Sequence, residues 1–149
     1  MAYIIYMRQV DKKIYEVCSS LVLVRNNRFV LLYDRNKKHY VLPQGHKKKK
    51  ETLPETALRE AREETGYQEL FVIRKLGRYK YHFNQGRKTI YKTIHVYLVK
   101  VISGKRHQNT QNVNEDFVVR IFTFKDAIKM VRWKQDKKYI SLARNFLRT

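Results

Sequence analysis

One stretch near the middle of the chain constrains the fold more than any other, because it carries both start and stop signals for a helix. Thr52 is a suitable N-cap with Glu55 three residues later, and Pro54 falls in the first turn, where its missing N–H group is tolerated. Gly66 is placed to end the helix. These signals predict a helix of about 13 residues between Thr52 and Gly66.

Acidic residues gather on and just before this helix, although the rest of the chain is strongly basic. Five of the 13 Asp and Glu residues fall here, namely Glu51, Glu55, Glu60, Glu63 and Glu64. The last three are spaced so that their carboxylates project from one helix face and repel one another. Oxygen ligands of this kind suit hard divalent cations, Mg²⁺ in particular. The cluster therefore indicates a cation site, with surface ion pairs to Arg59 and Arg62 as the alternative.

The remaining pattern is mostly strand-like, with turn residues at Asn26-Asn27 and at positions 84–86. Strands are predicted for residues 3–10, 17–24, 28–33, 70–83, 88–102 and 117–124. Two further helices are predicted, over residues 125–131 and from residue 136 onward. Because no linker or repeat divides the sequence, we expect a single domain over residues 1–149. Its class should be α/β (α+β), with the central helix packed on a mostly antiparallel or mixed sheet.

Net charge narrows the class of partner. The chain carries 33 Lys and Arg against 13 Asp and Glu, a net charge of +20, which favours polyanions such as nucleotides, RNA or polyphosphates. A hydrophobic content of 43% excludes a disordered basic tail. The one cysteine, Cys18, excludes an internal disulfide and fits a reducing compartment. With no apolar run of ~18 residues and no secretory pattern, we expect a cytoplasmic protein without a membrane partner.

The helix and the loop before it also follow a known family pattern. Residues 45–67 read GHKKKKETLPETALREAREETGY. This segment resembles the Nudix signature Gx5Ex7REUxEExGU, in which U is a bulky apolar residue. The residues at the defined positions are Gly45, Glu51, Arg59, Glu60, Ala61, Glu63, Glu64, Gly66 and Tyr67. The resemblance implies the Nudix-type α/β/α sandwich, with a mixed sheet on which the signature helix packs.

The same resemblance implies an activity and a set of site residues. In Nudix hydrolases, which depend on Mg²⁺ with Mn²⁺ as an alternative, water attacks phosphorus and breaks a pyrophosphate bond of a nucleoside diphosphate linked to another moiety. By likeness, Glu60, Glu64 and the backbone carbonyl of Gly45 are metal ligands, and Glu63 either binds metal or deprotonates the attacking water. In some family members a glutamate on a later loop is the base. Glu115 has a comparable place here, with a solvated surface acid as the alternative.

Other residues around the signature receive supporting roles. By likeness, Glu51 and Arg59 form an ion pair that holds the loop against the helix. Lys47 and Lys48 belong to a run of four lysines, residues 47–50, that lies next to the predicted metal site. Such a run is normally a solvated loop, but at this location it would attract a substrate with several phosphates.

Two strand residues are further substrate-binding candidates. Lys92 shares a strand face with apolar neighbours, and a lysine there is unfavourable unless it meets an anion such as phosphate or reaches solvent at the sheet edge. Tyr81 aligns with Tyr79 and Phe83 on one face of the preceding strand. Such a stripe is commonly core packing, but by likeness Tyr81 is a candidate for stacking on a base.

The substrate remains open at the level of the sequence. Residues 42–46 and 81–98 resemble asymmetric dinucleoside tetraphosphate hydrolases and their diphosphoinositol polyphosphate relatives, which favours a dinucleoside polyphosphate such as diadenosine tetraphosphate. The alternatives are a nucleoside triphosphate or a diphosphoinositol, removal of pyrophosphate or a cap from RNA 5′ ends, and a basic nucleic-acid-binding protein with a vestigial signature. No protein partner is indicated.

Overall fold

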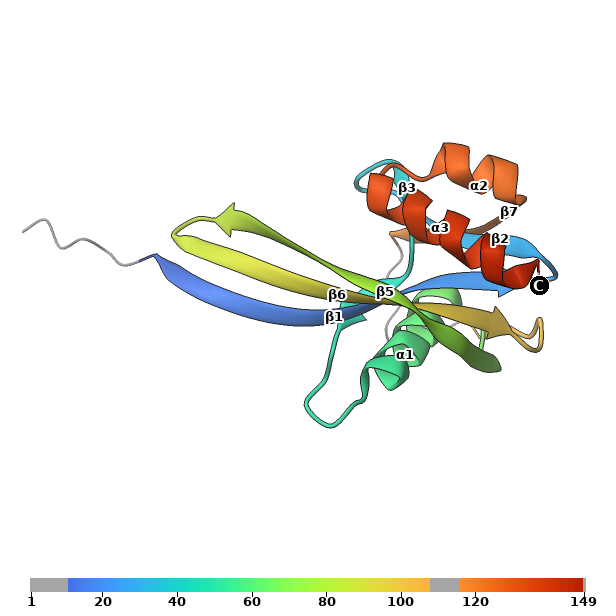
Figure 1. Ribbon diagram of the computed structural model, residues 1–149, viewed down its shortest axis with the longest axis horizontal. Coiled ribbons are helices and arrows are strands. Elements are labelled where there is room, and N and C mark those ends of the chain that lie inside the picture. Colours follow the sequence, from blue (N-terminus) through green and yellow to red (C-terminus); the bar gives the residue numbers. More distant parts are fainter. Residues whose placement is uncertain (1–10, 108–115, 149) are drawn as a thin grey trace, which may run out of the picture.

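A computed structural model describes residues 11–107 and 116–148, which form one mixed sheet with helices on both faces (Figure 1). The elements are β1 (Lys12–Arg25), β2 (Arg28–Asp34), β3 (His39–Val41), β4 (Gln44–His46), α1 (Leu53–Thr65), β5 (Leu70–Gln85), β6 (Lys88–Val101), β7 (Phe117–Phe122), α2 (Phe124–Met130) and α3 (Lys134–Leu147). The predicted strand 3–10 lies outside the described residues. No helix in the described ranges is long and apolar enough to span a membrane.

The sheet is mixed because one pair of long strands runs parallel. The strand order is β3-β2-β1-β6-β5, with β4 added beside β1 and β7 beside β2. Strands β1 and β6 are parallel, and the other pairs are antiparallel. The predicted hairpin between β1 and β2 is confirmed, since Asn26 and Asn27 take the positive φ angles of 49° and 61° that a tight turn requires. The predicted α+β class with a mixed sheet is also confirmed.

Two hydrophobic cores lie on opposite faces of this sheet. Alternate residues of β1 point in opposite directions, so Cys18 and Val22 pack toward α2 and α3, whereas Leu21 and Leu23 pack toward α1. Figure 1 shows α1 on one side of the sheet and α2 and α3 on the other. β1 is therefore buried on both faces in its second half, and the site described below is anchored to this strand.

Helix α1 forms as its capping signals predict. Thr52 Oγ1 accepts a hydrogen bond from the Glu55 N–H at 3.2 Å, and Gly66 ends the helix with a φ of 82°. The Gly66 N–H donates to the Arg62 carbonyl at 2.9 Å. Because Ala57 and Ala61 are fully buried and small, the helix axis can approach the sheet closely and the longer acidic side chains remain on the flank.

Several predicted boundaries were wrong, and each error has a local reason. The turn between β5 and β6 is centred on Gly86 (φ 61°), because residues 84 and 85 still pair with β6. β7 ends at Phe122 instead of residue 124, because Thr123 Oγ1 accepts from the Asp126 N–H at 3.3 Å and caps α2. Two short strands that the sequence pattern did not predict, β3 and β4, lie just before and at the start of the signature. α3 begins at Lys134, two residues before the predicted start.

The largest difference concerns β1, which begins at Lys12 and not at residue 17. Its first half pairs in parallel with β6, from Lys12 opposite Lys88 onward. We define the arm as residues 12–17 of β1, 78–85 of β5 and 88–93 of β6, which project together beyond the helical body (Figure 1). The local pattern of residues 12–16 is too polar to predict a strand. These residues form one by pairing with β6, which lies over 70 positions away in the sequence.

Candidate active site

The signature carboxylates lie beside β4, which runs against the middle of β1. Gly45 pairs with Ser19, and Ser19 Oγ in turn donates to the Leu53 carbonyl at 2.8 Å, which ties the start of α1 to the same strand. The Gln44 N–H donates to Glu64 Oε1 at 3.3 Å. A cavity of about 510 Å³ opens between these elements, lined by Gln44, Gly45, His46, Lys47, Lys48, Arg59, Glu60, Glu63, Glu64 and Phe117.

Gly45 makes room for one of the carboxylates. A Cβ atom at this position would lie 1.9 Å from Cδ and 2.0 Å from Oε1 of Glu60. Real atoms do not approach so closely, so the Glu60 carboxylate occupies the space that any other residue at position 45 would fill. The signature glycine is therefore required by a close approach between the backbone of β4 and a side chain of α1.

Arg59 is the main positive partner of the cluster. Its Nε and Nη2 donate to the two oxygens of Glu51 at 2.6 and 2.9 Å, and Nη2 also donates to the His46 carbonyl at 2.8 Å. Hydrogen bonding with Arg59 lowers the pKa of Glu51 to about 2, and the acids raise the pKa of Arg59 in return. The ion pair expected between Glu51 and Arg59 is present, and it fastens the loop to α1.

Arg59 also reaches the predicted metal ligands. Its Nη1 donates to Glu60 Oε1 at 2.7 Å and to Glu63 Oε2 at 3.3 Å. Consistent with these contacts, no group of three or more His, Cys, Asp or Glu side chains in residues 11–107 and 116–148 is arranged around a common metal position. In this conformation the guanidinium occupies oxygens of two glutamates that the signature predicts as metal ligands.

Glu64 is the most perturbed acid of the cluster. Burial, hydrogen bonding with Glu60 and the negative charges of Glu60 and Glu63 together raise the pKa of Glu64 to about 9. One guanidinium therefore does not neutralise the cluster. The donor set consists of carboxylate oxygens beside the backbone of a glycine whose side-chain space is filled by Glu60. This chemistry fits a hard divalent cation such as Mg²⁺ or Mn²⁺.

An aromatic groove continues from the carboxylates toward α3. This second cavity, about 520 Å³, shares Gln44, Glu64 and Phe117 with the first. Its aromatic lining comes from Tyr79, Tyr81, Phe117, Trp133 and His39. The Tyr79 ring stacks on Tyr81 with centroids 6.2 Å apart, and Trp133 is 53% exposed at the rim. The carboxylate cavity and the aromatic groove are thus adjacent, with Gln44, Glu64 and Phe117 bordering both.

Three of the four predicted substrate-binding residues line one of the two cavities, and the fourth does not. Lys47 and Lys48 line the first cavity, and Tyr81 lines the second. Lys92 lines neither of them; its side chain is 16% exposed and Nζ lies 3.6 Å from Glu16 Oε2. Glu115 falls outside the described residues, so its candidate role as base stays a prediction.

Sequence reasoning missed three contributors to this region. Glu16 binds His46 Nε2 at 2.8 Å as well as Lys92, which provides the anion that a lysine on that strand face needs. Phe117 lies where the two cavities meet, and Trp133 lies at the groove rim. The one available signal was Trp133, the single tryptophan of the chain, which interrupts the polar connection between the last two predicted helices.

The buried Asp136, which lines the groove, makes the stability of the folded protein depend on pH. Its carboxyl is 8% exposed, and burial raises its pKa to about 7 from the ordinary 3.8. Between these values the unfolded chain ionises while the folded carboxyl stays protonated, so stability falls as pH rises from about 4 to about 7 and then levels off. Burial, and secondarily the charge of ionised Asp136, raise the pKa of Tyr79, which lines the same groove.

We therefore expect Asp136→Asn to stabilise the protein at pH 8 and to leave it nearly unchanged at pH 4. The gain should be about 1–2 kcal/mol, because the position in the first turn of α3 already favours a negative charge and offsets part of the burial penalty. Urea unfolding of both proteins across this pH range measures the difference. A gain of the same size at both pH values would contradict the explanation.

Comparisons with known proteins agree with the fold and the signature. The family model described as NUDIX domain matches residues 15–143. A protein of Mycobacterium tuberculosis (strain CDC 1551 / Oshkosh) named mutator protein MutT4 is 38% identical over 74 residues, which cover 50% of this chain and 29% of that relative. The match thus spans less than a third of the relative's length.

Solved structures extend the likeness to most of the chain. The C. elegans Ap4A hydrolase binary complex has a TM-score of 0.68 and 20% identity, over 89% of this chain and 98% of that one. A NUDIX hydrolase from Nitrosomonas europaea has a TM-score of 0.64 and 17% identity, over 88% and 89% of the two chains. At these identities the likeness concerns the fold.

Proposed function

The chain belongs to the Nudix family of hydrolases, and from this premise we propose that it is a Mg²⁺-dependent pyrophosphohydrolase whose substrate is a dinucleoside polyphosphate such as diadenosine tetraphosphate. Nudix enzymes act on pyrophosphate bonds of nucleotides and generally use a divalent metal, typically Mg²⁺. The observation that carries the proposal is that a cavity lined by the carboxylate cluster and an aromatic groove lie next to each other and share Glu64.

Glu60, Glu64 and the backbone carbonyl of Gly45 would hold the cation, consistent with the oxygen-only donor chemistry of the cavity. When bound, Mg²⁺ supplies neutralisation of phosphate charge and a lowered pKa for its water ligands. Arg59 has other acceptors in Glu51 and the His46 carbonyl, so it keeps its anchor when Glu60 and Glu63 turn to the cation. The loop therefore stays fixed while the acids change partner.

Glu63 is the proposed residue that orients and deprotonates the attacking water. Its side chain is 29% exposed, more than that of Glu60 at 13%, so a water molecule can reach it from the cavity. Its link to Arg59 is the longest hydrogen bond of the guanidinium, at 3.3 Å. A loosely held carboxylate at the open side of the cluster suits a residue that exchanges a proton during turnover.

The two adjacent cavities would take the two chemical parts of the substrate. Lys47 and Lys48 border the carboxylate cavity and offset the charge of a long phosphate chain. In the groove, Tyr81 and Trp133 offer exposed rings on which a base can stack. A substrate with several phosphates and at least one base uses both cavities, and the likeness to a protein named as an Ap4A hydrolase supports diadenosine tetraphosphate as the first compound to assay.

The experiment is a hydrolysis assay with Mg²⁺ on dinucleoside polyphosphates, nucleoside triphosphates, ADP-ribose, diphosphoinositols and 5′-triphosphate RNA, with products identified. We expect the highest kcat/KM for a dinucleoside polyphosphate and cleavage of an internal anhydride. Preference for the RNA would instead assign the protein to RNA 5′-end processing. If the protein hydrolyses none of these compounds, the proposal of a nucleotide pyrophosphohydrolase is contradicted.

A matched pair of variants tests the groove. Trp133→Ala should raise KM for the preferred dinucleotide about tenfold with little change in kcat, because one base–aromatic stacking contact is lost. Phe71→Ala is the control, since Phe71 is similarly exposed, at 58%, and lines neither cavity. Equal KM values for both variants would show that bases bind elsewhere.

A further inference from the structure

The arm carries a second aromatic surface that the proposed reaction does not use. Strand register places Tyr15, Tyr91 and His82 side by side across β1, β6 and β5. The rings of Tyr15 and Tyr91 stack with centroids 5.2 Å apart and 18° between their planes, and His82 lies 5.3 Å from Tyr91. Tyr15 is 73% exposed, so the stacked pair is open to solvent.

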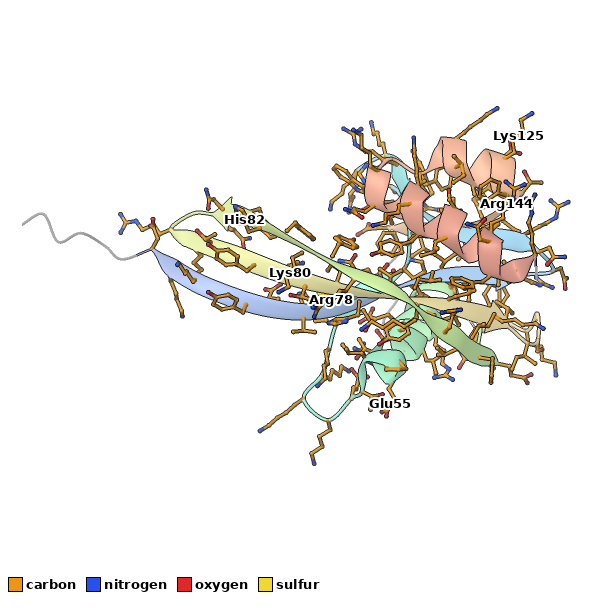
Figure 2. All side chains as sticks on the ribbon, in the orientation of Figure 1. Glu55, Arg78, Lys80, His82, Lys125 and Arg144 are labelled. Atoms are coloured by element: carbon orange, nitrogen blue, oxygen red, sulfur yellow. The ribbon has the colours of Figure 1, made fainter. Side chains whose placement is uncertain are left out.

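Neighbouring rows of the same face supply cations and hydroxyl groups. On the side nearer the helices, the neighbouring cross-strand row consists of Val17, Thr93 and Lys80. On the side nearer the free end of the arm, the neighbouring row contains Lys13. We call this surface the tyrosine face, defined by Lys13, Tyr15, Val17, Arg78, Lys80, His82, Tyr91 and Thr93. Figure 2 marks Arg78, Lys80 and His82 in order along β5.

Asp11, which directly precedes β1, is the acidic residue nearest to Lys13 among the described stretches of the sequence, and the two form no ion pair. Glu16 is the acidic residue within the arm, and it lies on the opposite face, where it contacts Lys92 and His46. Within the part of the chain that the structure describes, Lys13, Arg78 and Lys80 form no ion pair. Three cations around an exposed aromatic row therefore present a surface that is complementary to phosphates and bases together.

The aromatic row of the tyrosine face lies apart from the aromatic groove, although Lys80 borders both surfaces. Tyr81 points to the other side of β5, where it stacks with Tyr79 and Phe83. The odd-numbered side chains of β1 continue from Tyr15 and Val17 to Ser19, which contacts the first turn of α1. The loop of four lysines starts at this edge, where the Lys47 N–H donates to the Val17 carbonyl at 2.9 Å. The cationic surface thus extends from the arm toward the loop beside the carboxylates.

We propose that the tyrosine face binds single-stranded RNA, with bases stacked on Tyr15 and Tyr91 and phosphates on Lys13, Lys80 and Arg78. Aromatic rings on an open sheet face, flanked by cations, are a general means of holding unpaired bases. Hydroxyl groups of Thr93 and the two tyrosines stand among the rings and provide hydrogen-bonding partners for the ribose 2′-OH, which distinguishes RNA from DNA. This surface would act independently of the hydrolytic site.

The test measures fluorescence anisotropy of a labelled single-stranded RNA of about 12 nucleotides with the full chain, in EDTA so that no metal-dependent hydrolysis occurs. Tyr15→Ala should weaken binding about tenfold, and Tyr91→Ala by a similar factor. The control is Phe83→Ala, because Phe83 lies on the opposite face of the same strands and should bind RNA like the wild type. Hydrolysis of the preferred nucleotide should be unchanged in Tyr15→Ala.

A charge variant gives a readout that does not depend on the rings. Lys13→Ser combined with Arg78→Ser should flatten the dependence of log K on log salt by about 1.4, since each phosphate contact to a single strand contributes about 0.7, and neither residue lines a cavity of the proposed active site. An unchanged slope would overturn the proposal. So would undetectable RNA binding, wild-type affinity in Tyr15→Ala, or equal affinity for single-stranded DNA. Self-association that Tyr15→Ala abolishes would assign the face to a second copy of this chain instead.

Discussion

Replacement of Glu64 by Gln should lower kcat by about a thousandfold or more while the protein stays folded. Glu64 is the proposed ligand at the junction of the two cavities, and several kcal/mol of charge stabilisation in the transition state depend on a correctly held cation. The Gln side chain has nearly the same shape and keeps an oxygen that can accept from the Gln44 N–H. When a cation is bound, the change therefore removes the negative charge of the ligand and little else.

Stability should move in the opposite direction to activity. The Glu64 carboxylate is buried beside Glu60, and both burial and repulsion disfavour its charged form in the folded protein. A neutral amide avoids both effects, so Glu64→Gln should unfold at the same or a higher temperature than the wild type in the absence of metal. A variant that loses activity and stability together would point to a structural role for this residue.

The same helix offers a matched control for this variant. Glu55 lies in the first turn of α1, is exposed, and is turned away from the sheet in Figure 2. Glu55→Gln changes charge by the same amount without touching either cavity, so hydrolysis should remain at the wild-type rate. Mg²⁺-dependent turnover and thermal unfolding, measured on both variants, separate the local effect from general electrostatics. Wild-type turnover in Glu64→Gln would refute the metal-ligand assignment.

The signature region was predictable because its signals are local. The caps at Thr52 and Gly66 and the spacing of Glu60, Glu63 and Glu64 are all read within one helix, and the structure brings the three acids together beside Gly45. The contacts of Arg59 were foreseen in two ways. Its pairing with Glu51 follows from the family pattern, and its ion pairs with Glu60 and Glu63 correspond to the alternative that the acidic cluster left open at the level of the sequence.

The groove and the arm could not be derived in the same way, because both depend on contacts between distant segments. Trp133 and Phe117 reach the groove from the connection before α3 and from β7, and neither belongs to the signature. Lys92 shows the same limit. Its strand and face were predicted, but its partner Glu16 lies on β1, over 70 positions away in the sequence. Register between distant strands decides which side chains meet.

Gly45→Ala should reduce kcat/KM about a hundredfold with little loss of stability. The new methyl group would occupy the position of the Glu60 carboxylate, which must move away from β4. That carboxylate ends a flexible side chain, and residue 45 lies in a strand without a positive φ angle, so the backbone accepts alanine. We expect the free energy of unfolding to change by less than about 1 kcal/mol, whereas displacement of a ligand by about an ångström is enough to disable catalysis.

Gly86→Ala is the complementary control. If Glu60 acts from its position against β4, Gly45→Ala should lose activity and keep stability, whereas Gly86→Ala should lose stability and keep activity. Gly86 has no atom within 4 Å of an added Cβ but has a φ of 61°, a conformation that disfavours alanine by about 1 kcal/mol or more. It lies at the tip of the arm, so Gly86→Ala should lose stability and keep full hydrolytic activity. Urea unfolding and steady-state kinetics with Mg²⁺ measure both quantities. Full activity in Gly45→Ala would mean that Glu60 does not act from the position against β4, because only that position conflicts with the methyl group.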